Sequence, residues 1–496
     1  MKVTLADGIA NKGILVIGLA FDDGKKPSLI VESGDLVLDT KPLLEALKTM
    51  GATGKADEVL KLPAAGFQLL VFTGLGKVAR TYPHEILRRA AGAATRSLVG
   101  NSAVSYSLPT PDLQSVSAIA EGAVLGSYAF DEFKGKTKGQ AKNLVTSITI
   151  LTSFAKSSAA KSIPQRAVIV GEYTTLVRNL VNTPPSHLYP VSFVDAFKKA
   201  VAKAGGEKSH LTLSVLNEKQ LKAQGFGGII GVGQGSANPP RLLHISYTPK
   251  KATKKYALVG KGITFDTGGL NLKLGLGMEA MKSDMAGAAA VCAATLAIAA
   301  LKLPVTIHAW APLAENMVSD CATRPGDILT MYGGKTVEVL NPDAEGRLIL
   351  ADALVKAAEE KSLDGLIDVA TLTGAQTVAL GTRTSAVMTN NDEISQSFLA
   401  AAHESGESFW PMPLPEEMRP SLESPVADLA NMGENMGKML VAGLFLKEFV
   451  PSDLPWVHLD IASPAYNETG AFGYTPIGGT GIALRSLIRF IENASA

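Results

Sequence analysis

The sequence predicts an α/β protein whose larger, C-terminal part is built on a mostly parallel sheet. Short apolar runs alternate with helical stretches along most of the chain, which is typical of α/β domains. In the C-terminal part the expected strands are apolar throughout, as in strands covered by helices on both faces. At 496 residues the chain is also longer than one ordinary domain. We therefore expect two domains.

Residues 1–165 are expected to form a small N-terminal α/β domain without a catalytic constellation. The segment that follows, 166–190, indicates a helix ended by Pro184 and Pro185, because proline cannot continue a helix. We place the connection between the domains there. Strands are expected at 13–21, 67–76, 102–109 and 144–152, and helices at 84–99 and 113–130.

Residues 191–496 are expected to form the larger domain, in which strands and helices continue to alternate. In parallel sheets of this kind, functional sites gather at the carboxyl ends of the strands. Strands are expected at 255–262, 305–314, 335–341, 365–374, 385–390 and 456–463, and helices at 284–303, 346–360, 438–450 and 479–494.

Composition excludes several classes of protein. Hydrophobic residues make up 46% and charged residues 19%, which fits a folded protein with a large core. The net charge of +1 gives no general attraction to nucleic acid or to anionic membranes. Only Cys292 and Cys321 are present, and the start of the chain lacks the apolar core of a signal peptide. We expect a cytoplasmic location and no membrane partner.

One uncharged stretch, residues 285–301, resembles a membrane span in composition. It consists mostly of alanine and glycine, and it is shorter than the ~20 residues that usually span a bilayer. The sequence therefore predicts a buried helix in the core of the larger domain.

Polar clusters follow three expected strand ends or helix starts. The first is the glycine-rich segment 260–269 with Lys273, the second is 281–284, and the third is 341–347. In the third cluster Asp343, Glu345 and Arg347 are spaced by two, so an extended segment would point them the same way. Pro342 favours such an extended form in the residue before it.

The carboxylates of these clusters predict a pair of divalent metal ions. Crowded carboxylates repel one another unless a cation or a proton lies between them. The alternative is that Asp284 and Asp343 are helix N-caps, since aspartate is a favoured cap. Capping does not explain the glycines at 268, 269 and 346, which fit a backbone close to a ligand. The carboxylates expected to converge are Asp266, Asp284, Asp343 and Glu345.

The three motifs resemble those of the leucyl (cytosol) aminopeptidases, which are two-metal exopeptidases. They read VGKGITFDTGG at 259–269, MKSDMAGAAA at 281–290 and NPDAEGRLILADAL at 341–354. The resemblance covers roughly residues 182–482, including AENM at 314–317 and DVATLTGA at 368–375. It implies a larger αβα catalytic domain, a homohexamer and peptide substrates cut at a free, preferably Leu-like, N-terminus.

The resemblance also implies roles for single residues. Asp266 and Glu345 would bridge two metals, Asp343 would complete one site, and Lys261 and Asp284 would complete the other. Lys273 and Arg347 would be catalytic, with bicarbonate near Arg347 as the general base, and Met281 would line the substrate pocket. The ligand set suits Mn²⁺, Zn²⁺ or Mg²⁺ and does not choose among them. The chain departs from the family at Pro342, where threonine is usual, which removes a backbone N–H donor.

Other motifs in the sequence give weaker indications of function. The glycine-rich run 231–236 lacks the Gly-Lys-Ser/Thr ending of a phosphate loop and the Rossmann glycine spacing. The histidines show no H-x-x-x-H pair, His458 is expected in the core, and no G-x-S-x-G motif marks a nucleophilic serine. The alternative function is DNA binding, as in some bacterial members of the family. Its only hint is the 19 Lys and Arg against 14 Asp and Glu in residues 1–165.

Overall fold

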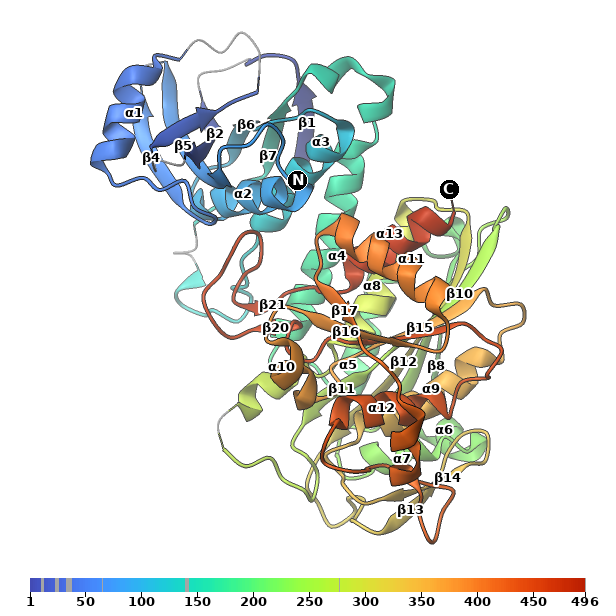
Figure 1. Cartoon of the computed structure of the whole chain (residues 1–496). Helices are drawn as coiled ribbons and strands as arrows, with labels where there is room; N and C mark the ends of the chain where they lie inside the picture. The colour runs from blue at the N-terminus through green and yellow to red at the C-terminus, as the bar shows by residue number, and fades with distance from the viewer. Residues whose placement is uncertain are drawn as a thin grey trace. The chain divides into compact units, whose positions relative to one another are not determined.

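The structure is a computed structural model that describes residues 1–9, 13–22, 26–32, 38–64, 66–138, 142–275 and 277–495. The chain forms two compact units, coloured from blue to red along the chain in Figure 1. The first comprises Met1–Thr175 and Glu468–Ile477, and the second Leu176–Asn467 and Gly478–Ala496. The division falls inside helix α4 (Ile163–Asn182), which ends just before Pro184 and Pro185. The connection expected from the sequence is the segment 166–190.

The first unit is a seven-stranded sheet with the order β1-β7-β6-β2-β5-β4, in which β3 also pairs with β2, at Gly18–Phe21. Four pairings are parallel, while β3 and β4 are antiparallel to their neighbours. Helices α2 and α3 pack on one face, and α1 packs with residues of the other. The strands are β1 (Lys2–Ala6), β2 (Ile14–Phe21), β3 (Pro27–Ile30), β4 (Val59–Ala64), β5 (Phe67–Lys77), β6 (Ala103–Ser107) and β7 (Ser147–Leu151), and the helices are α1 (Thr40–Thr49), α2 (His84–Ser97) and α3 (Leu113–Gly126).

The second unit is built on a nine-stranded sheet with the order β17-β16-β19-β15-β10-β12-β9-β8, in which β11 also pairs with β12. The central strands β12, β10, β15 and β19 are parallel, and antiparallel pairings occur only towards the two flanks of this sheet, among the described residues. The expected α/β class and mostly parallel sheet are confirmed. The strands are β8 (Leu211–Leu216), β9 (Arg241–Tyr247), β10 (Lys254–Gly260), β11 (Gly262–Asp266), β12 (Val305–Asn316), β15 (Gly365–Ala370), β16 (Ser385–Thr389), β17 (Phe409–Pro411) and β19 (Trp456–Asp460).

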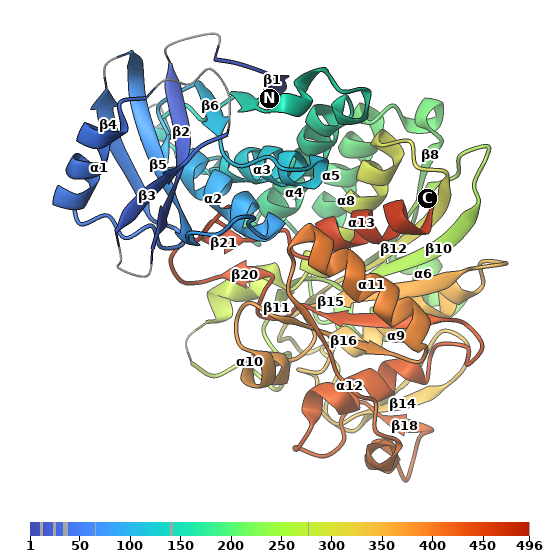
Figure 2. The same cartoon turned by 45° about the horizontal axis from the view of Figure 1, so that its top comes forward.

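Helices cover both faces of this sheet: Figure 1 shows α8, α11 and α13 apart from α9 and α12, and Figure 2 shows α13 between α8 and α11. The alternation of side chains along β10 explains the two layers. Tyr256 packs on Phe490 of α13, whereas Ala257 and Val259 lie in the apolar cluster that contains α9. The helices are α5 (Pro190–Lys203), α6 (Glu218–Gln224), α7 (Gly227–Gly233), α8 (Ala286–Ala300), α9 (Gly346–Ala358), α10 (Gly374–Leu380), α11 (Asp392–Ser405), α12 (Lys438–Lys447) and α13 (Leu484–Ala494).

Helix α8 is the uncharged stretch noted in the sequence. The segment Met278–Ala300 is long and apolar enough to span a membrane by length and composition, but 94% of its apolar window is buried inside the fold. A helix that is apolar all round and buried by its neighbours is a core helix. The expected buried helix is confirmed.

Shorter elements complete the second unit. A three-stranded sheet is formed by β13 (Asp327–Thr330), β14 (Thr336–Val339) and β18 (Leu429–Ala430), and a two-stranded one by β20 (Tyr466–Asn467) and β21 (Gly478–Gly479). The strand expected at 335–341 is therefore β14, which lies outside the nine-stranded sheet. Residues Glu468–Ile477, between β20 and β21, belong to the first unit.

One buried carboxylate, Asp352 of α9, ties three segments together. It has no solvent exposure and accepts backbone N–H groups from Ile229 of α7, at 2.8 Å, and from Tyr332 between β13 and β14, at 2.7 Å. Burial raises the pKa of Asp352 to about 7, against these backbone hydrogen bonds, which lower it.

Asp352→Asn should destabilise the second unit by ~1–3 kcal/mol, because the amide NH₂ would face a backbone N–H that loses its acceptor. Urea unfolding followed by tryptophan fluorescence measures this, since Trp310, Trp410 and Trp456 all belong to the second unit. Glu359→Gln, at a side chain that is 49% exposed, is the matched control. Equal unfolding midpoints for the two variants would contradict the anchoring role.

Candidate metal centre

The polar clusters meet at the carboxyl edge of the nine-stranded sheet, as the topology of a parallel sheet requires. Lys261 directly follows β10, and its backbone N–H donates to Val369 of the neighbouring strand β15 at 2.9 Å. Asp266 is the last residue of β11, which pairs with the end of β12. Asp284 directly follows the 3-10 helix η5 (Met278–Ser283) and lies two residues before the start of α8. Glu345 directly precedes α9.

Lys261 is the innermost cation of the cluster. Its Nζ atom lies 2.8 Å from Asp284 Oδ1 and 2.9 Å from Glu345 Oε1, and it donates to the carbonyl of Thr371 at 2.8 Å. The hydroxyl of Thr371 donates to the same Asp284 oxygen at 2.8 Å. Only 4% of the Lys261 side chain is exposed, so this lysine is buried within the cluster.

Lys273 bridges the other two carboxylates. Its Nζ atom lies 2.7 Å from Asp266 Oδ2 and 2.5 Å from Asp343 Oδ1. One oxygen each from Asp266, Asp343 and Glu345 lie within 4.8 Å of one another, close enough to share a metal ion. Because 26% of the Lys273 side chain is exposed, it lies on the side open to solvent. The structure thus brings together all four carboxylates and both lysines that the sequence singled out.

The third motif reaches this cluster by a different local structure from the expected one. Residues 342 and 343 form a turn and Glu345 is helical, with φ −80° and ψ −35°. The cause is Asn341, whose side-chain oxygen accepts the N–H of Asp343 at 2.8 Å and closes an Asx turn. The expected extended segment is therefore wrong. The capping alternative is also wrong for Asp284, because the N-cap of α8 is Met285, and for Asp343, because that of α9 is Glu345.

Arg347 lies in the first turn of α9 and is buried. Its NH1 group donates to the carbonyl of Asn431 at 2.8 Å, and its guanidinium carbon lies 5.9 Å from the centre of the Phe445 ring. Burial lowers the pKa of Arg347 to about 10, although Glu345 and Asp460 oppose this shift. Its Nε–H has no protein acceptor among the described residues.

The electrostatics of the cluster call for additional positive charge. Burial raises the pKa of Asp284, and the nearby Glu345 and Asp266 raise it further. Burial and Asp266 raise the pKa values of Glu345 and Asp343 in the same way. For Lys261 and Lys273 burial lowers the pKa, but the surrounding carboxylates outweigh it and hold both values above the ordinary lysine range.

Two ammonium groups do not balance four carboxylates, and the buried Oδ2 of Asp284 has no hydrogen-bond partner among the described residues. Divalent cations prefer oxygen ligands, and this cluster offers carboxylate oxygens with an excess of negative charge. The residues present therefore fit a divalent metal centre.

The glycines of the motifs have two structural reasons. Gly268 and Gly269 have φ values of +85° and +60°, in the left-handed region that favours glycine. A Cβ atom on Gly346 would lie 2.3 Å from Cε of Lys261. The sequence predicts that the backbone at Gly346 lies close to a ligand. In the structure it lies close to the Lys261 side chain instead.

Three supporting residues were not singled out from the sequence. Asn316 Nδ2 donates to Asp266 Oδ1 at 2.8 Å and to the carbonyl of Pro342 at 3.1 Å, joining the first and third motifs. Asn431, fully buried, accepts the N–H of Asn341 at 3.1 Å and donates to its carbonyl at 2.7 Å. Asn316 and Thr371 lie inside the AENM and DVATLTGA segments, so the resemblance carried a signal for them. Asn431 lies outside the quoted segments.

A cavity of about 780 Å³ adjoins the cluster and is lined by Asp343 and Arg347. Most of its remaining lining is apolar and rich in methionine. Met281, expected in the substrate pocket, lies in η5 and does not line this cavity. The methionines of the cavity are Met412, Met432, Met436 and Met439.

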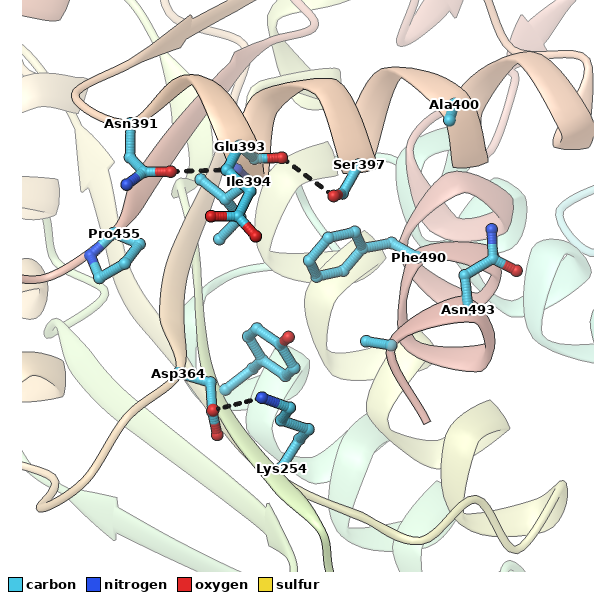
Figure 3. A pocket seen from close by; sticks show the side chains of 12 residues that line it. Lys254, Asp364, Asn391, Glu393, Ile394, Ser397, Ala400, Pro455, Phe490 and Asn493 are labelled. Atoms are coloured by element: carbon cyan, nitrogen blue, oxygen red, sulfur yellow. Dashed lines mark hydrogen bonds and ion pairs between the residues drawn. The ribbon is translucent and has the colours of Figure 1, made fainter. Parts of the chain in front are cut away.

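A second cavity, of about 480 Å³, lies at the opposite edge of the sheet (Figure 3). It is lined by Lys254 at the start of β10, by Asp364 just before β15 and by Pro455 just before β19. Figure 3 shows Lys254 paired with Asp364 and the ring of Phe490 facing the same space. These are the amino ends of the parallel strands, so this cavity is separate from the metal centre.

A mostly parallel sheet with a cluster of carboxylates and lysines at its carboxyl edge defines a metal-dependent α/β enzyme. Residues 175–488 match the model of the cytosol aminopeptidase family, catalytic domain, and residues 20–137 match that of its N-terminal domain. The chain belongs to the cytosol aminopeptidase family. It is accordingly a metal-dependent aminopeptidase, a hydrolase that acts on peptides.

Relatives and solved structures are similar to this chain over nearly its full length. A protein of Streptomyces griseus named "Probable cytosol aminopeptidase" is 49% identical, over 97% of this chain and 96% of its own. One of the same name from Micrococcus luteus is 47% identical, over 96% and 95%. The bottromycin maturation enzyme BotP in complex with Mn has a TM-score of 0.85 and 35% identity, over 98% and 100% of the two chains. A mutant of tomato leucine aminopeptidase has a TM-score of 0.83 and 31% identity, over 99% and 96%.

Gly346→Ala should lower aminopeptidase turnover ~100-fold, because the added methyl group displaces Lys261, and misplacement of an active-site group by about 1 Å costs that much. Turnover of leucine amide at saturating Mn²⁺ measures the effect. Gly135→Ala is the control, since a Cβ atom there meets nothing within 4 Å. Wild-type turnover of the Gly346 variant would show that the position of Lys261 is not required.

Proposed function

We propose that this enzyme releases N-terminal residues, preferably Leu-like apolar ones, from peptides with two divalent metal ions in the centre described above. The observation that carries the proposal is the convergence of four carboxylates, three of them buried. Asp266 and Glu345 are assigned as the shared ligands. Both lie within reach of Asp343. Glu345 also contacts Lys261, and the charge of Asp266 raises the pKa values of Lys261 and Asp284. Asp343 completes one site.

Lys261 and Asp284 complete the other site. The Lys261 Nζ atom contacts the Asp284 carboxylate, and it contacts Glu345 as well. Carboxylates with one amine suit Mn²⁺ or Zn²⁺, and Mg²⁺ as a third choice. Manganese is favoured among them because the BotP structure carries Mn.

The residues of the chain divide the remaining work. The ions, when bound, supply Lewis-acid polarisation of the peptide carbonyl and activation of water near neutral pH. Lys273 remains an ammonium and donates to the oxygen of the substrate carbonyl as negative charge develops there. Its partial exposure and its raised pKa fit this role.

Arg347 is assigned to hold bicarbonate, the proton acceptor that the family resemblance implies. Its buried Nε–H group has no acceptor in the described part of the protein, and its side chain lines the cavity beside Asp343. A buried guanidinium with an unused donor is suited to bind a planar oxyanion.

The apolar, methionine-lined cavity supports a preference for apolar peptide side chains, because methionine packs adaptably around ligands of varied shape. We keep Met281 as a residue of the pocket for the N-terminal side chain, since it lies three residues before Asp284. Met281→Asp would then shift the preference away from apolar first residues, and an unchanged substrate profile would remove Met281 from the pocket.

By family resemblance we also propose a cytoplasmic homohexamer, which a mass measurement in solution tests directly. A DNA-binding role rests only on the positive excess in residues 1–165 and has less support. In a gel shift, phosphate-driven binding would weaken steeply as salt rises.

N-acetylation of a substrate should abolish its cleavage, because we propose that a free N-terminal amine is bound at the metal centre. Initial rates on leucine amide and on N-acetyl-leucine amide, with equal Mn²⁺, make the comparison. Equal rates on the two substrates would show that the amine is not recognised.

The two lysines should respond differently to replacement by methionine, which keeps the side-chain length and removes the amine. Lys261→Met should retain fewer ions per subunit after dialysis. In the wild type, binding at that site should weaken as pH falls, since the amine must lose a proton to ligate. Lys273→Met should keep both ions and lose ~2.7–4 kcal/mol of transition-state stabilisation, as for an oxyanion-hole donor.

Metal content by mass spectrometry, measured beside kcat on the same samples, separates the two roles. If Lys273→Met lost metal while Lys261→Met kept it, the roles would be exchanged and the proposed mechanism wrong.

A further inference from the structure

We propose a separate divalent metal site, of the zinc class, formed by His244, His308 and Glu360. One ligand-capable atom from each of these residues lies within 4.8 Å of the others. This site would be additional to the catalytic centre, and the proposal does not depend on the assigned roles of the catalytic residues.

The sheet places the two histidines side by side. In the antiparallel pairing of β9 with β12, His244 lies opposite Trp310. His308 precedes Trp310 by two residues, so its side chain points to the same face as that of Trp310. Glu360 follows the end of α9, the helix that covers this face of the sheet.

The distances suit a metal ion. His244 Nε2 lies 3.2 Å from His308 Nδ1, and His308 Nδ1 lies 3.5 Å from Glu360 Oε1. Zinc–ligand bonds of ~2.0–2.1 Å in a tetrahedron separate neighbouring ligand atoms by about 3.3–3.4 Å. Two imidazoles and one carboxylate are a ligand set that zinc uses, with a fourth position for water. All three residues are half-buried, so an ion can reach them from solvent.

The surroundings hold the ligands in position. The ring of His244 stacks on Trp310 with centroids 3.8 Å apart and planes 8° apart. Burial, helped by His308 and Lys356, lowers the pKa of His244 to about 3, which keeps the imidazole in the neutral form that binds metal. The nearby cations are engaged elsewhere: Lys356 contacts Glu359 at 2.6 Å, and Lys255 donates to the carbonyl of Lys361 at 2.8 Å.

The site is distant from the catalytic centre. His308 and Asn316 lie on the same strand, β12, and Asn316 contacts the catalytic carboxylate Asp266. Eight residues of strand at ~3.3 Å each separate them by about 26 Å. Metal bound at the two places can therefore be removed independently.

The test is the zinc content per subunit of the full-length enzyme, equilibrated with buffered free Zn²⁺ and measured by mass spectrometry. The wild type should carry one zinc ion per subunit more than His308→Gln, while kcat on leucine amide stays the same. Glu360→Gln, which keeps the shape of the side chain, should weaken binding at this site ~10-fold or more. His403→Gln, on the exposed face of α11, is the control for surface histidines and should match the wild type.

Trp310 gives a second readout. Co²⁺ should quench part of the tryptophan fluorescence in the wild type, and Trp310→Phe and His308→Gln should both abolish that component. The competing explanation of the 3.2 Å contact is a direct hydrogen bond between the two imidazoles. Equal zinc contents in the wild type and His308→Gln, with Co²⁺ quenching unchanged, would establish that explanation and overturn the proposed site.

Discussion

The repulsion among four clustered carboxylates, three of them buried, is the constraint on which the catalytic unit depends. Asp266, Asp284 and Glu345 are each at most 5% exposed, so water does little to screen them. Two like charges ~4 Å apart cost about 4 kcal/mol even at an effective dielectric constant of 20. Lys261 and Lys273, each between two carboxylates, offset part of this cost. Divalent cations, when bound, would offset the rest.

The fold keeps these charges together by strand topology and hydrogen bonds that take no part in the proposed catalysis. Parallel strands deliver Lys261 and Asp266 to the same edge, and the start of α9 presents Glu345, where the helix dipole favours a negative charge. Asn316 holds the third motif against the first by hydrogen bonds, and the buried Asn431 anchors the third motif through the backbone of Asn341. Asp352 anchors the middle of α9 by accepting backbone N–H groups from Ile229 and Tyr332. The centre is thus supported by buried amides and carboxylates whose hydrogen bonds are nearly all satisfied.

Much of this arrangement follows from the sequence alone. Continuous apolar runs such as 365–370 predict buried parallel strands, and strand order brings the motifs to one edge. The turn at 342–343 could not be predicted in this way, because the side chain of Asn341, rather than Pro342, determines the local backbone. The methionine-lined cavity was missed because Met412, Met432 and Met436 lie outside regular helices and strands, where periodicity gives no signal. Likewise Glu468–Ile477 join the first unit through contacts distant in sequence.

The central claim is that two ions share Asp266 within a cluster that needs them. The most direct measurement compares Asp266→Ala with the wild type for metal content and turnover at a free Mn²⁺ concentration that saturates the wild type. Circular dichroism shows whether the variant is folded. The account predicts a folded variant that has lost the catalytic ions and has no measurable turnover. A folded Asp266→Ala enzyme with near-normal turnover in the presence of metal would contradict it.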